Sequence, residues 1–143
     1  MRTLYWFCVL AAILFSSATA QTQGRFGAGI MFGEPTGAAW KYNLSQQNTL
    51  AGGVGISPSN EFRAHVDYLW YSAPFSEPRL RVHYGPGAAL GEDMFGIRGD
   101  VGLTYLIQDS PIDIFLEIAP TLDLANGGEL RLMGGFGGRY LFN

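Results

Sequence analysis

The chain has 143 residues, of which 48% are apolar, 14% are aromatic and only 15% are charged, and it carries 20 glycines and a formal net charge of −3. So much apolar sequence with so little charge excludes a disordered chain. Nine basic against twelve acidic residues leave no electrostatic footprint for binding nucleic acid. The only long apolar run lies at the N-terminus, which excludes a polytopic helical membrane protein, and the length fits one small domain.

The N-terminal segment has the three parts of a secretory signal. A short basic start precedes the apolar run Leu4–Phe15, and Ala18-Thr19-Ala20 forms a small-residue cleavage site. The run is shorter than the roughly 20 residues that span a membrane as a helix. We therefore predict a cleaved signal peptide over residues 1–20 and an exported domain over residues 21–143. The only cysteine, Cys8, leaves with the signal, so the exported domain has neither a disulfide nor a cysteine-based metal site.

After the signal, hydrophobicity alternates with a period of two, which is the spacing of a strand with one polar and one apolar face. The stretch Glu61–Tyr71 is the clearest case, because every even position from Phe62 to Trp70 is apolar. Eight such segments are separated by short breaks with turn residues, including a tight-hairpin signal at Asn126–Gly128. They are Arg25–Gly33, Thr36–Asn43, Thr49–Ser57, Glu61–Tyr71, Arg79–Leu90, Phe95–Tyr105, Asp113–Asp123 and Glu129–Phe142. Short connections favour neighbouring antiparallel strands, so we predict an all-β, eight-stranded up-and-down barrel.

Alternation alone leaves open which face points inward. A soluble lipocalin-like barrel is apolar inside, whereas an outer-membrane barrel is polar inside and apolar outside. Glycines gather on the polar face, where small residues relieve crowding in a narrow lumen. Charges of both signs fall in the middle of strands on that same face, as pairing in a partly desolvated lumen requires. These features favour a transmembrane barrel with short loops.

Aromatic residues on the apolar face sort by height along the barrel. If the first strand runs upward, eight of them lie at the lower ends of the strands, and Phe32, Phe62 and Phe95 lie at the upper ends. Two belts around an aliphatic band are typical of the interfacial girdles of outer-membrane barrels. The predicted lower girdle consists of Phe26, Trp40, Tyr42, Tyr68, Trp70, Tyr105, Tyr140 and Phe142. A soluble β-sandwich with core aromatics also satisfies simple alternation and stays an alternative.

Several stretches resemble those of known small barrels. The end Gly137–Phe142 resembles the glycine-x-x-aromatic-x-phenylalanine signal of outer-membrane assembly, although Asn143 here follows the aromatic residue that usually comes last. The mature chain looks like the eight-stranded barrels of OmpA- and OmpX-like architecture, and it resembles a family of short barrels of spirochaetes and other Gram-negative bacteria. The stretches that carry this likeness are Gly33–Gly37, Lys41-Tyr42, His65–Trp70, Tyr84–Gly87 and Pro111–Leu124. The resemblance implies an outer-membrane location and contact with the barrel-assembly machinery, and it transfers no activity.

Ionisable residues of the polar face form the candidate site. Two imidazoles and a carboxylate on consecutive strands, His65, Asp67 and His83, can bind a metal or serve as base and orienting group. The alternative is a structural network of lumen hydrogen bonds and ion pairs. We predict that network and expect no metal and no cofactor. Its members are Lys41, Arg63, His65, Asp67, Arg81, His83, Arg98, Asp100, Glu117, Arg131 and Arg139.

These observations lead to an expected function. A monomeric barrel in outer-membrane lipid, with a structural or surface-interaction role and no catalysis, fits the sequence best. A lipid-modifying enzyme is an alternative, although the His-x-Ser pair of the lipid A hydrolases does not occur. A narrow channel is another, although eight strands leave a lumen that side chains fill. A soluble periplasmic ligand-binding barrel is the third.

Overall fold

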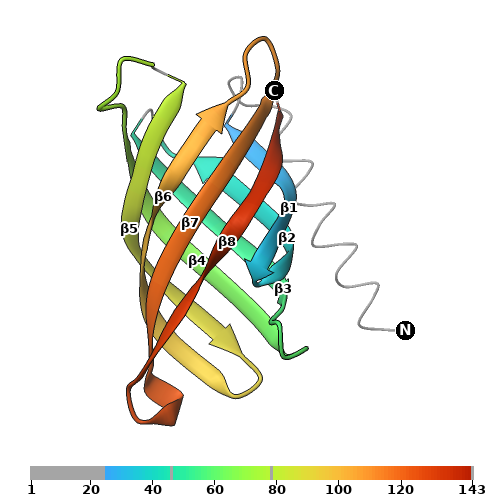
Figure 1. Ribbon diagram of the computed structural model, residues 1–143, viewed down its shortest axis with the longest axis vertical. Coiled ribbons are helices and arrows are strands. Elements are labelled where there is room, and N and C mark those ends of the chain that lie inside the picture. The colour runs from blue at the N-terminus through green and yellow to red at the C-terminus, as the bar shows by residue number, and fades with distance from the viewer. Residues whose placement is uncertain (1–24, 46, 78, 143) are drawn as a thin grey trace.

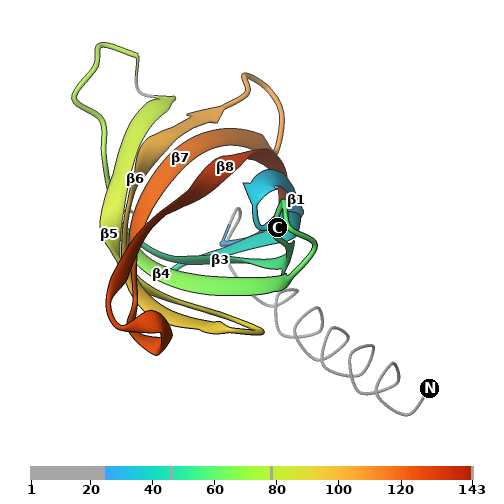
Figure 2. The same cartoon turned by 60° about the horizontal axis from the view of Figure 1, so that its bottom comes forward.

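The computed structural model describes residues 25–45, 47–77 and 79–142, and the predicted signal peptide of residues 1–20 lies outside the described residues. Eight antiparallel strands form one closed barrel in which each strand pairs with the next and β8 pairs with β1 (Figures 1 and 2). The strands are β1 Phe26–Glu34, β2 Thr36–Asn43, β3 Asn48–Ile56, β4 Phe62–Ser72, β5 Leu80–Gly91, β6 Met94–Leu106, β7 Ile112–Asp123 and β8 Glu129–Phe142. The predicted eight-stranded up-and-down barrel is thereby confirmed, and every strand boundary lies within one residue of its predicted position.

The connection between β7 and β8 differs from the predicted tight hairpin. It contains one 3₁₀ turn, η1, over Leu124–Asn126, which projects from the lower end of the barrel in Figure 1. The Asp123 carboxylate accepts a hydrogen bond from the Ala125 N–H, and Gly127 then adopts a left-handed φ of 73°. The aspartate before the glycines therefore caps a short helical turn, and residues 124–128 connect the last pair of the β7–β8 ladder, Asp123 and Glu129.

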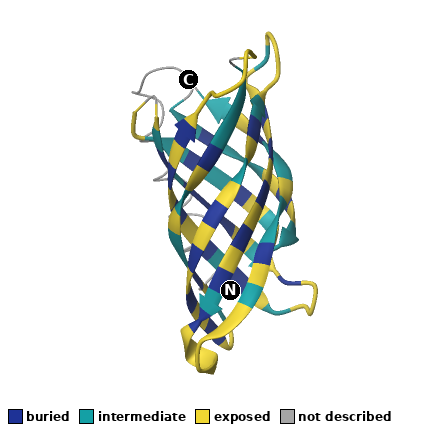
Figure 3. Ribbon diagram, turned by 60° about the vertical axis from the view of Figure 1, so that its left-hand side comes forward, coloured by how far each residue is buried: buried dark blue, intermediate teal, exposed yellow. Residues whose placement is uncertain are grey.

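Side chains alternate between the interior and the exterior along every strand, which gives the chequered pattern of Figure 3. In β7, for example, Asp113 and Glu117 are buried while Leu116 is 57% exposed. Fifteen polar or charged residues of the described part are buried against ten apolar ones, and 27 large apolar side chains are exposed. The interior is thus predominantly polar and the exterior predominantly apolar. In the described part no helix is long and apolar enough to cross a membrane, a criterion that does not apply to strands.

Small apolar clusters fill the space between the charged groups of the interior. The buried apolar residues are mostly alanine and methionine, with Leu69, Tyr71 and Phe115 as the larger members. Close backbone approach accompanies this packing, because a Cβ on Gly29 would lie 1.9 Å from the carbonyl oxygen of Gly138. The lumen is therefore filled by side chains, as expected for a barrel of eight strands.

The eight aromatic residues of the predicted lower girdle occupy outward positions near the barrel end where β1 begins and β8 ends, which is the upper end in Figure 1. Several touch one another across strands: the ring centroids of Phe26 and Phe142 are 6.0 Å apart, and those of Tyr68 and Trp70 are 5.1 Å apart. Near the other end, the rings of Phe32 and Phe136 lie 5.7 Å apart. The outer surface therefore carries aromatic groups toward both rims.

Candidate functional site

The inward-facing charged residues form three groups stacked along the lumen, and the eleven residues of the predicted network are distributed among them. We call these groups the cation cluster, near the chain termini, the carboxylate cluster, in the middle, and the mouth cluster, at the opposite end. The cation cluster comprises Lys41, Arg81, Asp113 and Arg139; the carboxylate cluster comprises His65, Asp67, His83, Arg98, Asp100 and Glu117; the mouth cluster comprises Glu34, Glu61, Arg63, Asp123 and Arg131.

The cation cluster is organised around Asp113, which is 1% exposed. Lys41 Nζ lies 2.6 Å from Asp113 Oδ2, and Arg139 Nε donates a hydrogen bond of 2.9 Å to Asp113 Oδ1. In the strand register Gly27 pairs with Lys41 and Gly29 pairs with Arg139, so β1 has no side chains that would separate the two cations. One carboxylate therefore serves two buried cations from β2 and β8.

Aromatic faces complete the surroundings of these cations. The guanidinium of Arg139 lies 4.2 Å from the ring centroid of Phe115, and that of Arg81 lies 4.8 Å from the centroid of Tyr71. The ammonium group of Lys41 is 5.3 Å from the same Tyr71 ring. Because the negative face of an aromatic ring attracts cations, these contacts offset part of the excess positive charge.

The sequence placed Asp113 on the polar face but did not assign it to the network. Arg139 is the register partner of Asp113 in the β7–β8 pair, whereas Lys41 lies on β2, which reaches Asp113 only after β1 pairs with β8. Alternation within a strand gives neither the register nor the closure. The available signal was an imbalance of charge: Lys41 and Arg139 lie on strands that contain no carboxylate of their own in mid-strand. A closed barrel requires another strand to supply that carboxylate.

The carboxylate cluster begins at Arg98, whose Nε lies 3.0 Å from Asp67 Oδ1 without the alignment of a hydrogen bond. Arg98 Nη2 is 4.0 Å from Asp100 Oδ2, which is beyond hydrogen-bond distance. His65 Nε2 is 3.6 Å from Asp67 Oδ2. Arg98 therefore pairs closely with Asp67 and only remotely with Asp100.

His83 joins two other carboxylates of the same cluster. Its Nε2 lies 3.8 Å from Asp100 Oδ1 and 3.5 Å from Glu117 Oε2, while Nδ1 shares a hydrogen bond of 2.8 Å with Thr104 Oγ1. In the register Gly102 lies between His83 and Glu117, and a Cβ there would be 2.7 Å from His83 Nε2. The missing side chain of Gly102 thus provides the space that the imidazole occupies.

The group of His65, Asp67 and His83 that the sequence suggested does not assemble. His83 pairs in register with Tyr71, and Asp67 pairs with Gly87, so the two residues are four positions apart along the β4–β5 ladder. At a rise of about 3.4 Å per residue, four positions correspond to about 14 Å along the strand. The two side chains therefore lie at different heights, although both point inward. The structure instead joins His65 to Asp67 and His83 to Asp100 and Glu117.

Thr104, His83 and Glu117 present a hydroxyl, an imidazole and a carboxylate in sequence, which is the order of groups in nucleophilic catalysis. Thr104 is 4% exposed and His83 is 1% exposed. Both side chains are enclosed by the packed lumen, and the hydrogen bond with Thr104 fixes the orientation of the imidazole.

The mouth cluster is the most accessible of the three groups. Arg63 donates hydrogen bonds to Glu34 at 3.2 Å and to Glu61 at 2.9 Å, and Arg131 Nε donates one of 3.0 Å to Asp123 Oδ2. A polar hollow of about 350 Å³ opens between these residues. Arg131 is 36% exposed, so this predicted network member lies at the rim of the lumen.

A scan against protein-family models, a search of curated proteins and a search of solved structures each found no match for this chain.

Proposed function

We propose that this chain is an integral outer-membrane protein that crosses the lipid as an eight-stranded barrel with a filled, charged lumen. The predicted signal peptide of residues 1–20 would export it, and its role would be structural or surface-interacting, without catalysis. The proposal includes the resemblance of this chain to outer-membrane barrels of OmpA- and OmpX-like architecture. The observation that carries it is the reversed polarity of the fold, in which charged groups are buried and large apolar side chains are exposed.

The alternative of a soluble barrel fits this polarity poorly. Soluble monomers rarely expose contiguous apolar patches larger than a few hundred Å². Here consecutive outward positions are exposed and apolar, as Ile114, Leu116 and Ile118 are in β7 and Ile97, Val101 and Leu103 are in β6. In water this surface would favour aggregation, whereas in lipid it is the expected covering of a barrel.

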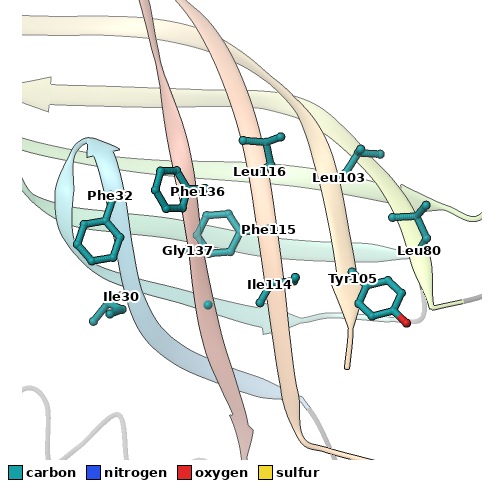
Figure 4. A pocket seen from close by; sticks show the side chains of 11 residues that line it. Ile30, Phe32, Leu80, Leu103, Tyr105, Ile114, Phe115, Leu116, Phe136 and Gly137 are labelled. Atoms are coloured by element: carbon teal, nitrogen blue, oxygen red, sulfur yellow. The ribbon is translucent and has the colours of Figure 1, made fainter. Parts of the chain in front are cut away.

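The outer surface also has a hollow suited to lipid. Between β1 and the strands β5–β8, apolar side chains surround Gly137 and Gly138 and leave about 630 Å³ of open space (Figure 4). Its rim includes Phe32, Leu116 and Phe136. Acyl chains of outer-membrane lipid would fill such a hollow without requiring a polar partner.

The sealed interior supports a role without transport or turnover. The middle of the lumen is occupied by ion-paired side chains that are almost wholly buried, and an aqueous channel needs about 16 strands. The accessible polar surfaces are the two rims. We therefore place any interaction with partners at the rims, such as the mouth cluster, rather than inside the barrel.

Cell fractionation with a matched pair of variants tests this proposal. Wild-type chain should remain with the outer-membrane fraction, change its gel mobility on heating, and begin at Gln21 by N-terminal sequencing. Leu116→Arg places a charge in mid-strand at an expected cost of about 2–4 kcal/mol and should block assembly. Leu124→Arg, at the η1 turn, is the control and should assemble, because a charge near the rim costs at most about 1 kcal/mol.

Two outcomes would contradict the proposal. Recovery of the wild-type chain in the periplasmic fraction without detergent would place the barrel in water. Equal assembly of the Leu116→Arg and Leu124→Arg variants would show that the apolar face does not contact lipid.

A further inference from the structure

We propose that His83, Asp100 and Glu117 form a binding site for a divalent transition-metal ion inside the barrel. The three residues come from the consecutive strands β5, β6 and β7, and their ligand atoms lie within 4.8 Å of one another. The inference depends on the closed barrel and its interior, and it is independent of whether the barrel resides in a membrane.

Two of the separations between these atoms are close to those of neighbouring ligands around a metal. His83 Nε2 lies 3.5 Å from Glu117 Oε2 and 3.8 Å from Asp100 Oδ1, which is too long for a hydrogen bond. Metal–ligand distances of about 2.0–2.2 Å in a tetrahedron place neighbouring ligand atoms about 3.4 Å apart. The side chains are therefore spaced to share a small central cation.

The same atoms lack hydrogen-bond partners despite complete burial. His83 Nε2 and both carboxylate oxygens of Asp100 are without a hydrogen bond, and the two side chains are 1% and 0% exposed. Leaving one such buried group unsatisfied costs about 1–3 kcal/mol, and charged groups cost more. A metal ion would satisfy all three atoms together.

The local charge points to the same conclusion. Arg98 is paired with Asp67, so Asp100 and Glu117 bring two carboxyl groups to a site where the third member is an imidazole. Two carboxyl groups buried side by side need either a bound proton or a cation to limit their charge. A divalent cation supplies the compensating charge.

The hydrogen bond between His83 Nδ1 and Thr104 Oγ1 prepares the imidazole for this role. Metal-bound histidines usually donate their second ring N–H to an oxygen, which fixes the tautomer and the orientation of the ring. When Nδ1 carries the proton, Nε2 presents its lone pair to the two carboxylates. That arrangement is repulsive when the site is empty and favourable around a cation.

The donor set selects the class of ion. One imidazole with two carboxylates suits zinc, iron or manganese, whereas calcium and magnesium prefer oxygen ligands alone. Zn²⁺ and Co²⁺ are practical probes, because Zn²⁺ can be counted by elemental analysis and Co²⁺ reports its coordination through visible absorption.

The test uses the full chain, purified and folded in detergent, with folding verified by heat-modifiable mobility. Because the site is sealed, ZnCl₂ or CoCl₂ is supplied during refolding and excess ion is removed by gel filtration. We expect about one Zn²⁺ per chain and a Co²⁺ spectrum of a low-coordinate nitrogen- and oxygen-ligated site. Calcium supplied in the same way should not be retained.

Isosteric variants locate the ion. Asp100→Asn, Glu117→Gln and His83→Gln should each lower Zn²⁺ affinity on the order of 100-fold or more, and Thr104→Val should lower it about 10-fold by releasing the imidazole. His65→Gln is the matched control, because His65 is also a buried imidazole beside a carboxylate and yet lies outside the site. It should retain the ion with unchanged affinity.

Three results would overturn the site. These are the absence of stoichiometric Zn²⁺ in folded wild-type chain, retention of the ion by the folded Asp100→Asn variant, and a loss in His65→Gln equal to that in His83→Gln. Asp100→Asn keeps the test decisive if another variant does not fold, since it preserves shape and removes one buried charge.

Discussion

The cation cluster and the carboxylate cluster occupy the same lumen and satisfy their charges in opposite ways. In the first, Lys41 and Arg139 converge on Asp113 at 2.6 and 2.9 Å, and aromatic rings cover the cations. In the second, His83 approaches Asp100 and Glu117 no closer than 3.5 Å, and Arg98 Nη2 is 4.0 Å from Asp100 Oδ2. Ion pairing is therefore complete in the first layer, where Asp113 has two cations within 3 Å, and incomplete in the second, where Asp100 has none. In the incomplete layer, a bound cation would supply the missing positive charge.

The first prediction tests the complete layer and has the largest expected effect. Asp113→Asn removes the only carboxylate that pairs with both Lys41 and Arg139, and it leaves two buried cations uncompensated. We expect the free energy of unfolding to fall by about 3–5 kcal/mol. Urea unfolding of the barrel in detergent or lipid measures this loss.

The control for this prediction is Asp109→Asn, in the exposed β6–β7 connection at a left-handed φ of 58° that asparagine tolerates. It should change stability by less than about 0.5 kcal/mol. Equal effects of the two substitutions would mean that Asp113 does not hold the cation cluster together.

The second prediction concerns the space in the incomplete layer. Gly102→Ala would place a Cβ 2.3 Å from the carbonyl oxygen of Leu116 and 2.7 Å from His83 Nε2, so both the backbone and the imidazole must shift. We expect a destabilisation of about 1–3 kcal/mol, as for overpacking of a core. Urea unfolding again provides the measurement.

Gly99, on the outward face of the same strand, is a matched control because a Cβ there meets nothing within 4 Å. Gly99→Ala should leave stability unchanged or raise it by about 0.4–1 kcal/mol through the unfolded state. If both variants behave alike, the crowding around His83 is not a determinant of stability.

The third prediction is the smallest and has the opposite sign. Without metal, Asp100→Asn removes one of two neighbouring carboxylates that lack compensation, so we expect a gain of about 1 kcal/mol rather than a loss. With Zn²⁺ present during folding, the wild-type chain should be the more stable of the two. Unfolding curves with and without the ion check this reversal, and a large loss in the metal-free variant would show that Asp100 is already satisfied.

The fold was accessible from the sequence because a strand's facing depends on local alternation. Alternation puts Arg63, His65 and Asp67 on one face and Val66 on the other, and the glycines and mixed charges of the polar face indicate that this face points inward. The wider turn at Leu124–Asn126 was missed, because Asp123 caps it through a specific hydrogen bond that glycine content does not reveal.

The groupings within the lumen could be inferred only in part. Which inward residues meet depends on the stagger between neighbouring strands, and alternation does not determine that stagger. His83 faces Gly102 and then Glu117 because of the β5–β6 and β6–β7 registers, and Asp113 meets Lys41 only through closure of the barrel. The candidate residues were therefore identifiable from the sequence, whereas their partners required the structure.

The ligands of the proposed ion site all come from adjacent hairpins, which has a consequence for the order of assembly. His83, Asp100 and Glu117 can meet in an open three-stranded sheet, because their pairings span short stretches of chain. The pairing of β1 with β8 joins the two ends of the described chain and has the largest loop-closure entropy to overcome. An ion captured by the early sheet would be enclosed by that last pairing. Its occupancy would then record the metal content of the compartment where the protein folded, rather than that of the compartment where it resides.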